Sequence, residues 1–517
     1  MTVYSSPLPH VEVPDTSLTR YVMRRADDLA DQAAIIDGPT GRTVTYRELN
    51  VLIHRFAGGL VARGFGKGDV FGILLPNLPE YAVVFHGVAT AGGTSTTINP
   101  TYTGEEINHQ LVDSGARFLV TIPLFLDAAL EGVAGTAVEE VFVLGEAEGA
   151  TPFRVFLDAE PLAGEADIDP NEDLVVLPYS SGTTGLPKGV MLTHTNLVAN
   201  LAQVEHLISH EDGDAAIAVL PFFHIYGMQV LMNLVVGDGG TVITMPRFDL
   251  EEFLRLIQDH RVAHAYVVPP IVLALAKHPM VDQYDLSSLK RVFSGAAPLG
   301  AKVAQEASAR IGCEVVQGYG MTELSPVTHA TPLGGFKPGS IGVTISNTES
   351  RVVDPDTGRD LGLDEDGELW IRGPQVMKGY LNNPEATAIT IDEDGWLHTG
   401  DIGHIDADDH FFIVDRLKEL IKYKGFQIAP AELEALLLTH PAIADAAVIP
   451  IPDEEAGEVP KAFIVLRPDQ ELSEQDVQGF IAGHVAHYKQ IREVEFVDEI
   501  PKSASGKILR RLLRDRT

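Results

Sequence analysis

Residues Tyr179 to Val190, with the sequence YSSGTTGLPKGV, are the part of the chain whose composition points most directly to chemistry. Four serine and threonine side chains, three glycines and one lysine follow an apolar run, LVVLP, that is typical of a buried strand. In such a loop, backbone N–H groups and hydroxyls can face an anion without obstruction by bulky side chains. The segment therefore predicts a phosphate-binding loop. Its candidate ligands are Ser180, Ser181, Gly182, Thr183, Thr184 and Lys188.

The loop does not follow the common pattern G-x-x-x-x-G-K-[ST], because Pro187 stands five positions after Gly182, where that pattern has its second glycine. A short Gly/Ser/Thr-rich turn taken alone is often a flexible linker. A segment of this length that ends in Pro-Lys-Gly is not typical of a linker, so the composition favours phosphate binding.

Two other residues are notable for their chemical type. Cys313 is the only cysteine, which excludes a disulfide framework and any zinc or iron–sulfur site built from several cysteines. Beside Ile311 and Gly312 it is more typical of a small buried side chain than of a nucleophile. Lys507 follows Gly506 near the end of the chain, and composition alone favours a solvated lysine at this position.

Length and charge limit the classes of protein to consider. The 517 residues are 45% hydrophobic and 21% charged, which is ordinary globular usage and suggests two or three domains. There are 38 Lys and Arg against 73 Asp and Glu, a net charge of −35, so we expect no nucleic-acid partner and no anionic membrane surface. The single cysteine fits a reducing compartment, and neither end carries an export or anchoring signal that we recognise. We therefore expect a cytoplasmic protein.

The secondary-structure elements that must position these residues are predicted to alternate between strands and helices. From Val70 onward, short apolar runs alternate with helix-like segments, and the alternation returns in LVVLPYS, AHAYVVPP and LKRVFSG. After about residue 340, short strands and Gly-containing turns predominate, which predicts a β-rich subdomain. The charged segment from Asp415 to Lys424 then leads into an acidic helix, AELEALLLTH, and a compact tail.

The longest uncharged stretch, Ala215 to Gly237, is long enough for a membrane-spanning helix. It contains Pro221, His224, Gln229 and Asn233, which are poorly suited to a lipid-facing helix. We therefore predict a buried strand, a loop and a helix in this stretch, and no membrane partner.

Taken together, these segments resemble the adenylate-forming superfamily of acyl-CoA synthetases, aryl-CoA ligases, peptide-synthetase adenylation domains and beetle luciferases. The phosphate loop matches that family's loop, and further matches follow in order at Gln317–Glu323 (QGYGMTE), Gly367–Tyr380 (GELWIRGPQVMKGY), Trp396–Gly403 (WLHTGDIG), Asp415–Gln427 (DRLKELIKYKGFQ) and Pro501–Arg511 (PKSASGKILRR). The resemblance implies an α/β fold with a large N-terminal domain of α/β subdomains plus a β-rich subdomain, followed by a small, mobile α+β C-terminal domain. The implied ranges are an AMP-binding domain at 1–415, a hinge at 416–420 and a mobile domain at 421–517.

The resemblance also implies a two-step reaction. A carboxylate and ATP would form an acyl-adenylate and release pyrophosphate, and coenzyme A would then take the acyl group and release AMP. Charge that develops at the α-phosphate needs fixed cations and donors, and Lys507 matches the lysine that bridges the carboxylate and the α-phosphate. Glu323 and Thr184 match the residues that hold Mg²⁺. The remaining nucleotide contacts that the family motifs imply are Thr183, Gln317, Gly318, Tyr319, Thr322, Asp401 and Arg416.

The second step is expected to use the same site after a domain rotation. In the family, the C-terminal domain swings about the position of Lys418, which withdraws the Lys507 loop. The residues that would then face the adenylate and the pantetheine arm are Lys422, Lys424, Gly425 and Gln427. Arg247 matches a basic residue near the coenzyme A nucleotide, and His224 is expected to orient the carboxylate and assist the thiol.

Within the superfamily, the segments HIYG and SGAAPLG most resemble 4-coumarate:CoA ligases. Amino-acid-activating relatives place an aspartate where this chain has His224. The implied acyl pocket is lined by Tyr226, Tyr266, Phe293, Gly295, Ala296, Gly318, Gly320, Pro326 and Val327. Its glycines would leave a flat slot for a planar ring. Plant members often have Met and Lys where this chain has Tyr266 and Phe293, so we expect a more apolar floor.

Hydroxycinnamate-like acids are therefore the expected substrates, with medium- or long-chain fatty acids as the alternative. A different class also stays open, namely a nucleotide-binding phosphohydrolase that activates no acid. We expect a monomer or homodimer whose ligands are a small carboxylate, ATP, Mg²⁺ and coenzyme A.

Overall fold

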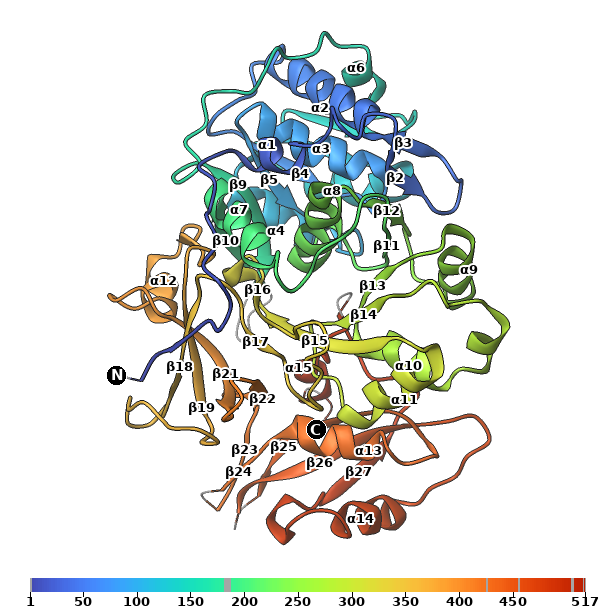
Figure 1. The fold of residues 1–517 in the computed structure, drawn as a ribbon, viewed down its shortest axis with the longest axis vertical. Helices are drawn as coiled ribbons and strands as arrows, with labels where there is room; N and C mark the ends of the chain where they lie inside the picture. The colour runs from blue at the N-terminus through green and yellow to red at the C-terminus, as the bar shows by residue number, and fades with distance from the viewer. Residues whose placement is uncertain are drawn as a thin grey trace.

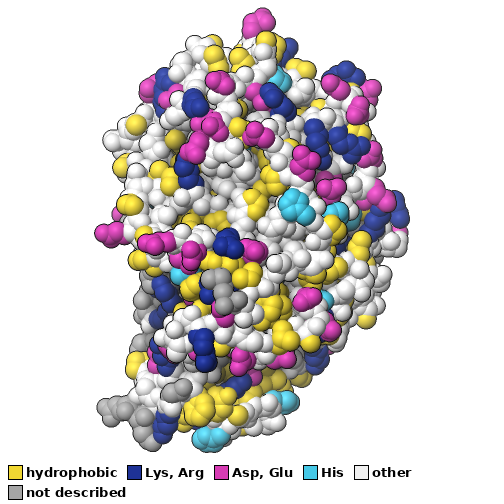
Figure 2. Space-filling view, turned by 60° about the vertical axis from the view of Figure 1, so that its left-hand side comes forward, with side chains coloured by type: hydrophobic (Ala, Val, Ile, Leu, Met, Phe, Trp, Pro, Cys, Tyr) yellow, Lys and Arg dark blue, Asp and Glu magenta, His cyan; other side chains and the backbone are white. Residues whose placement is uncertain are grey.

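The computed structural model describes residues 2–180, 187–424, 426–453, 456–503, 506–514 and 516. It has the predicted mixed α/β architecture, with a large body that runs from β1 to β22 and a small C-terminal lobe that runs from β23 to α15 (Figure 1). Two large sheets and a smaller antiparallel sheet make up the body, and the lobe has a sheet of its own. On one face of the molecule, acidic and basic side chains are interspersed (Figure 2).

The first large sheet begins the α/β alternation predicted from Val70. Its inner strands are parallel, whereas β10 and β20 join one edge in antiparallel orientation. In order across the sheet, the strands are β20 (Gly379–Tyr380), β10 (Lys188–Thr193), β9 (Leu174–Ser180), β5 (Thr94–Thr97), β4 (Val70–Ile73), β6 (Ala116–Thr121), β7 (Glu140–Val143) and β8 (Thr151–Pro152). The helices near it in sequence are α2 (Tyr46–Val61), α3 (Pro79–Thr90), α4 (Gly104–Ser114), η1 (Pro123–Phe125), α5 (Leu126–Gly132), α6 (Arg154–Leu157) and α7 (His194–Gln203).

The second large sheet carries most of the predicted acyl pocket. Its central strands are parallel, and β3, β16 and β17 are antiparallel at its edges. In order, the strands are β17 (Val343–Thr344), β16 (Val327–Ala330), β15 (Glu314–Gly320), β14 (Arg291–Ser294), β13 (His264–Val267), β11 (Ala215–Ala218), β12 (Thr241–Thr244), β2 (Ala33–Asp37) and β3 (Thr43–Thr45). Its associated helices are α1 (Leu18–Val22), η2 (Tyr226–Asn233), α8 (Leu234–Asp238), α9 (Leu250–His260), α10 (Pro269–Lys277), η3 (Pro279–Gln283), α11 (Ala301–Ile311) and η4 (Thr322–Leu324).

The strands in the middle of these sheets are buried on both faces, as expected for parallel strands covered by helices. One continuous apolar core joins the two sheets and includes Phe56, Phe71, Val176, Ile217 and Val292. Helix ends follow local sequence signals. Thr103 and Glu106 form a reciprocal capping box at the start of α4, and Gly115 ends that helix with a left-handed φ of 65°.

The β-rich subdomain predicted after residue 340 is the five-stranded antiparallel sheet. Its strands, in order, are β1 (Tyr4–Ser5), β18 (Glu349–Val353), β19 (Gly367–Arg372), β21 (Leu397–Ile405) and β22 (Phe411–Arg416), with α12 (Pro384–Thr390) beside them. Its apolar core is separate from that of the large sheets and includes Val352, Leu369, Ile371, Leu397 and Phe411. The sheet brings Asp401 and Arg416 onto neighbouring strands.

The C-terminal lobe is an α+β unit with its own core, which includes Ile421, Leu433, Val448 and Ile464. Its strands are β23 (Ile421–Tyr423), β24 (Phe426–Ile428), β25 (Ile443–Asp453), β26 (Gly457–Leu466) and β27 (Glu493–Phe496). Its helices are α13 (Pro430–Leu437), α14 (Glu474–Ala482), η5 (His487–Lys489) and α15 (Arg510–Arg514). The predicted hinge, 416–420, spans the turn between β22 and β23, and Lys418 is exposed there.

The uncharged stretch from Ala215 to Gly237 forms β11, a loop, the π-helical segment η2 and the start of α8, as predicted. No helix among the described residues is both long and apolar enough to cross a membrane. Cys313 is half-buried against the large core, and burial raises the pKa of its thiol to about 11. The thiol is therefore protonated near neutral pH, as a buried structural cysteine would be.

Acid should destabilise this fold through its buried histidines. His86 and His329 are buried, and burial lowers the pKa of each to about 3. Below about pH 6.5 the unfolded chain binds protons at these rings and the folded chain does not, so the unfolding free energy falls as the pH decreases towards 3. Each ring accounts for about 1.4 kcal/mol per pH unit across that window.

Thermal unfolding followed between about pH 7.5 and about pH 5 measures this dependence. We expect the midpoint to fall with pH and the fall to be shallower in His329→Gln, whereas His206→Gln, at an exposed position, should keep the wild-type dependence. A His329→Gln protein with an unchanged pH dependence would show that this ring is not buried in its neutral form.

Candidate functional site

Predicted site residues lie at the carboxyl ends of parallel strands in both large sheets. Ser180 ends β9, Gly295 follows β14, and Gly320 ends β15. In open α/β sheets, ligands bind in the crevice outside the carboxyl ends of the strands. The structure therefore brings the start of the phosphate loop and the predicted acyl pocket to edges where ligands bind in this fold class.

Asp401 is a buried carboxylate held by two partners. It lies opposite Arg416 in the β21–β22 ladder, and Arg416 Nε is 3.1 Å from Asp401 Oδ1. The hydroxyl of Tyr319 donates to Asp401 Oδ2 at 2.6 Å, and Asp401 raises the pKa of Arg416. A carboxylate offers about four acceptor positions, so the two partners leave room for ribose hydroxyls.

Lys507 reaches this cluster from the C-terminal lobe. A Cβ built on Gly506, whose φ is +79°, would lie 3.4 Å from the Cβ of Val268, which precedes α10 in the body. The tip of the loop therefore packs against the body. Burial lowers the pKa of the Lys507 ammonium, the Arg416 guanidinium lowers it further, and the carboxylates of Asp401 and Glu323 act in the opposite direction. The ammonium thus lies within electrostatic reach of the two carboxylates predicted to act on the nucleotide and the metal.

Arg510 anchors the segment that carries Lys507. Its guanidinium pairs with Glu434 on α13 at 2.7 Å, donates to the carbonyl of Val448 at 3.1 Å, and also pairs with Glu419 in the predicted hinge. A buried, multiply bonded arginine is a rigid attachment point. The short turn before α15 therefore holds Lys507 in a defined direction.

Glu323 is a buried carboxylate on the one-turn helix η4. Its Oε1 accepts a hydrogen bond from the hydroxyl of Tyr380 at 2.9 Å. Lys188, at the end of the phosphate loop, has its ammonium 5.0 Å from the centroid of the Tyr380 ring. One aromatic side chain thus connects a residue of the phosphate loop with the candidate metal ligand.

A Mg²⁺ ion fits this donor set only together with phosphate oxygens. No group of three or more His, Cys, Asp or Glu among the described residues is arranged to hold a metal ion by itself. Mg²⁺ in nucleotide sites is usually held by one or two carboxylates, substrate phosphates and water. The buried carboxylate of Glu323 is a suitable protein ligand of this kind, and Thr184 lies outside the described residues.

His224 is held in its neutral form. Its Nδ1 accepts a hydrogen bond from the backbone N–H of Tyr226 at 3.3 Å. Burial, with a smaller effect from Lys507, lowers the pKa of the ring to about 3. A neutral ring whose Nδ1 is an acceptor carries its proton on Nε2. In this arrangement the ring is a hydrogen-bond donor, which suits the orientation of a carboxylate better than removal of a proton from a thiol.

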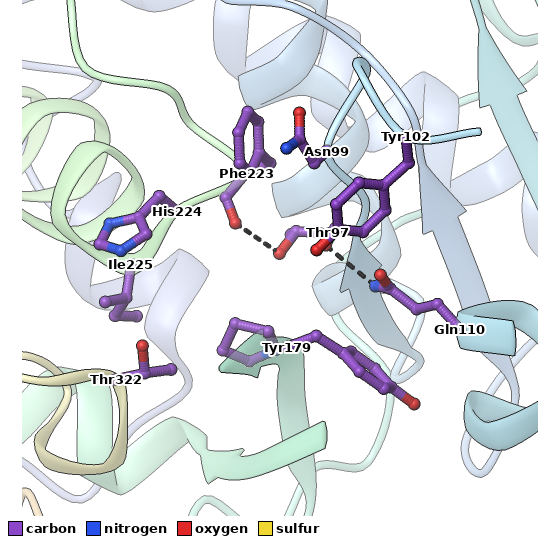
Figure 3. A pocket seen from close by; sticks show the side chains of 10 residues that line it. Thr97, Asn99, Tyr102, Gln110, Tyr179, Phe223, His224, Ile225 and Thr322 are labelled. Atoms are coloured by element: carbon purple, nitrogen blue, oxygen red, sulfur yellow. Dashed lines mark hydrogen bonds between the residues drawn. The ribbon is translucent and has the colours of Figure 1, made fainter. Parts of the chain in front are cut away.

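A small cavity of about 40 Å³ lies beside His224 (Figure 3). It is lined by Thr97, Asn99, Tyr102, Gln110, Pro178, Tyr179, Phe223, His224, Ile225 and Thr322. Thr97 Oγ1 donates to the carbonyl of Phe223 at 2.8 Å, and Gln110 donates to the carbonyl of Thr97 at 3.0 Å. The volume corresponds to a few water molecules. The sequence analysis did not identify the residues that β5 and α4 contribute to this cavity. The sequence feature that could have identified them is a polar run directly after a buried strand.

The predicted acyl pocket residues come together around two aromatic rings. Tyr266 and Phe293 are neighbours on β13 and β14, with ring centroids 6.0 Å apart. A Cβ on Gly318 would lie 2.4 Å from Phe293 Cζ, and one on Gly295 would lie 2.9 Å from the ring of Tyr226. Glycine is therefore required at both positions for these rings to lie against the strands, and the rings occupy the space beside the two glycines.

The other predicted pocket residues lie on β15 and β16 or directly after β14. Gly320 pairs with Val327 across β15 and β16, and a Cβ on Gly320 would lie 1.9 Å from the carbonyl oxygen of Pro326. Ala296 has a left-handed φ of 69° directly after Gly295. Backbone and side chains from three segments thus lie together at the position of the predicted pocket.

A polar chain that sequence analysis missed lies behind Tyr266. The hydroxyl of Tyr266 is 2.7 Å from His210 Nε2, and His210 Nδ1 is 2.9 Å from a carboxylate oxygen of Asp238. In the tautomer whose Nδ1 donates to Asp238, Nε2 accepts a hydrogen bond from the hydroxyl of Tyr266. No local sequence pattern predicts these hydrogen bonds, because Tyr266 and His210 are 56 positions apart.

Several other predicted nucleotide residues are close-packed. Gln317 is buried, its side-chain oxygen accepts from the N–H of Leu299 at 2.9 Å, and its carbonyl accepts from Thr331. Thr322 lines the cavity beside His224. These contacts fix the β15 edge next to Gly318 and Tyr319.

Other predicted residues are not brought to this cluster in the present arrangement. Lys422 and Gln427 lie opposite each other on the exposed β23–β24 hairpin, and Lys424 has a left-handed φ of 46° at the end of β23. Arg247 is exposed after β12. The predicted residues outside the described part of the chain are Ser181, Gly182, Thr183, Thr184 and Gly425.

Comparison with known proteins gives matches across the chain. Residues 22–381 match the family described as AMP-binding enzyme, and residues 432–507 match the AMP-binding enzyme C-terminal domain. The sequence is 47% identical to 4-coumarate--CoA ligase 3 from Oryza sativa subsp. japonica, over 100% of this chain and 95% of that protein. It is 45% identical to 4-coumarate--CoA ligase 1 from Petroselinum crispum, over 99% of this chain and 96% of that protein.

Solved structures are similar over nearly the whole chain. The anthranilate CoA ligase AuaEII in complex with anthranoyl-AMP has a TM-score of 0.90 and 28% identity, and the match covers 98% of both chains. ATP-bound MatB from Rhodopseudomonas palustris has a TM-score of 0.88 and 29% identity, and the match covers 97% of this chain and 99% of that one.

Proposed function

The chain belongs to the AMP-binding enzyme family, and on this premise we propose that it joins a carboxylic acid to coenzyme A through an acyl-adenylate. The observation that carries the proposal is that the C-terminal lobe brings the Lys507 loop against the body, where Gly506 packs on Val268 and the carboxylates of Asp401 and Glu323 act on the Lys507 ammonium. A lysine delivered by one lobe to a nucleotide-type site in the other suits a reaction whose charge develops at a phosphate between them.

In the first step, a carboxylate oxygen attacks the α-phosphorus of ATP, an oxygen–phosphorus bond forms, and pyrophosphate leaves. Lys507 would offset the negative charge shared by the carboxylate and the α-phosphate, and His224 would donate from Nε2 to the carboxylate. Asp401 would hold the ribose hydroxyls. Mg²⁺, when bound by Glu323 and the phosphates, would neutralise charge on the leaving pyrophosphate.

In the second step, the thiol sulfur of coenzyme A attacks the acyl carbon, and AMP leaves with the oxygen that came from the carboxylate. We propose that residues 421–517 rotate as a unit about the 416–420 segment, so that the β23–β24 hairpin replaces the Lys507 loop. The exposure of Lys422 and Gln427 in the present arrangement supports this assignment, because exposed side chains can contact a ligand in another lobe position. Arg247 is proposed to contact the coenzyme A nucleotide.

Replacement of Lys424 by alanine tests the role of the hairpin. We expect acid-dependent pyrophosphate release to stay near the wild-type rate and thioester formation to slow by about tenfold, because the hairpin enters the site only in the second step. Single-turnover measurements compare the rate of each step in the variant with that in the wild-type protein. Lys302→Ala, on the exposed face of α11, is the matched control. Equal slowing of both steps in Lys424→Ala would contradict the assignment.

We further propose aryl acids of the hydroxycinnamate type as substrates. The aromatic walls of Tyr226, Tyr266 and Phe293 against glycine backbone support a planar ring. The relatives named 4-coumarate--CoA ligases support the same class. We also propose a cytoplasmic monomer or homodimer.

The test is a panel of cinnamates, benzoates and fatty acids, each incubated with ATP, Mg²⁺ and coenzyme A. We expect AMP, pyrophosphate and a thioester in equal amounts, and the highest kcat/KM with a cinnamate. Release of ADP and phosphate without dependence on the acid would instead identify a phosphohydrolase, and faster turnover of fatty acids would overturn the substrate assignment.

A further inference from the structure

Tyr380 lies between two residues of the nucleotide site that come from different parts of the chain. It is 8% exposed, and it ends the segment GELWIRGPQVMKGY, for which the proposed reaction assigns no task. Its hydroxyl donates to Glu323 Oε1 at 2.9 Å, while its ring lies 5.0 Å from the ammonium of Lys188. The hydroxyl and the ring thus serve different partners.

The backbone holds Tyr380 at the end of the phosphate loop. Strand β20 is antiparallel to β10, with Tyr380 opposite Val190. On either side, Leu381 N–H donates to the carbonyl of Gly189 at 2.8 Å, and Lys378 N–H donates to the carbonyl of Met191 at 3.0 Å. These bonds fix the position of the ring relative to the strand that begins with Lys188.

Backbone hydrogen bonding also fixes the contact between Tyr380 and Glu323. The carbonyl of Glu323 accepts from the N–H of Met377 at 2.9 Å, three positions before Tyr380. In the hydrogen bond between the two side chains, the hydroxyl of Tyr380 is the donor and the carboxylate of Glu323 is the acceptor.

We propose that Tyr380 is a positioning residue that holds the ammonium of Lys188 and the carboxylate of Glu323 at a fixed separation for the Mg²⁺–triphosphate end of ATP. The proposal rests on the proposed function, since it assigns a task within the nucleotide site. An ammonium over an aromatic face gains electrostatic attraction from the ring, which restricts a long, flexible lysine side chain. A hydrogen bond to one oxygen of Glu323 directs the other oxygen of that carboxylate, as outer-sphere partners of metal ligands do.

The two contacts can be removed one at a time. Tyr380→Phe keeps the ring beneath Lys188 and removes the donor to Glu323, whereas Tyr380→Leu removes both. We expect Tyr380→Phe to weaken Mn²⁺ binding to the enzyme–ATP complex by about tenfold, measured by electron paramagnetic resonance in the absence of acid and coenzyme A. Tyr380→Leu should in addition weaken metal-free ATP binding, measured by calorimetry. Tyr284→Phe is the matched control, since Tyr284 lies in a loop after η3.

A double-mutant cycle makes the assignment specific. In a Glu323→Gln background, Tyr380→Phe should cause no further loss of Mn²⁺ binding, because the carboxylate through which it acts is gone. Thioester formation from a supplied acyl-adenylate, which contains no triphosphate, should proceed at the wild-type rate in Tyr380→Phe.

Unchanged Mn²⁺ binding in Tyr380→Phe, or an equal loss in the Glu323→Gln background, would overturn the proposal. A fall in the thermal midpoint with unchanged Mn²⁺ and ATP binding would assign Tyr380 to the core alone. Failure of the proposed function would be distinguished in the wild-type protein, which would then show no acid-dependent pyrophosphate release.

Discussion

Replacement of Lys507 by alanine is expected to lower acid-dependent pyrophosphate release by about 100- to 1,000-fold. Lys507 is half-buried, and its ammonium is within electrostatic reach of Asp401 and Glu323. A fixed positive charge in such surroundings stabilises developing phosphate charge far more than a charge in water does. Its loss should therefore act on the chemical step rather than on binding of the acid.

The same variant should still convert a supplied acyl-adenylate and coenzyme A to thioester at close to the wild-type rate. Rapid-quench measurements of each half-reaction separate the two outcomes. Arg511→Ala is the matched control, because Arg511 is exposed in the same segment, four residues beyond Lys507. Equal loss of both half-reactions in Lys507→Ala would contradict the proposal that this lysine serves only the first step.

Asp401→Asn is expected to weaken ATP binding by about 100-fold while the fold is retained. Asparagine keeps the shape and still accepts from the hydroxyl of Tyr319, but it removes the charge that pairs with Arg416. Hydrogen bonds to charged groups contribute about 1.5–3 kcal/mol each, so the loss of charge-assisted bonds to ribose accounts for a change of this size.

Calorimetric titration with ATP and with AMP measures the effect, and thermal unfolding reports on the fold. Asp408→Asn, at an exposed position that pairs with Lys337, is the matched control. Wild-type affinity for both nucleotides in Asp401→Asn would show that this carboxylate does not hold the ribose.

Local sequence was sufficient to predict the α/β alternation, the β-rich subdomain and the compact C-terminal lobe. Strand β14 lies in the segment LKRVFSG, where the sequence shows the α/β alternation again, and α3 and α4 lie among the helix-like segments after Val70. Burial of one face of an element is a local property, so the sequence pattern carries it directly.

The sequence pattern did not predict contacts between segments that are far apart in the chain. Nothing near His210 indicates that its ring forms a hydrogen bond with the hydroxyl of Tyr266, and the segment that contains Tyr380 does not reveal that its hydroxyl donates to Glu323. Such partners depend on how strands are ordered in the sheets. Likewise, the position of Lys507 beside the body depends on the orientation of the whole lobe, which no local pattern in KSASGK encodes.

The central claim is that this chain activates an acid by attaching it to the α-phosphate of ATP. The most direct test is a reaction with an acid labelled with ¹⁸O in its carboxylate, followed by mass spectrometry of the AMP. We predict that each AMP carries one oxygen atom from the acid, because that oxygen bonds to phosphorus in the first step and leaves with AMP in the second. AMP that carries no label from the acid would contradict the account.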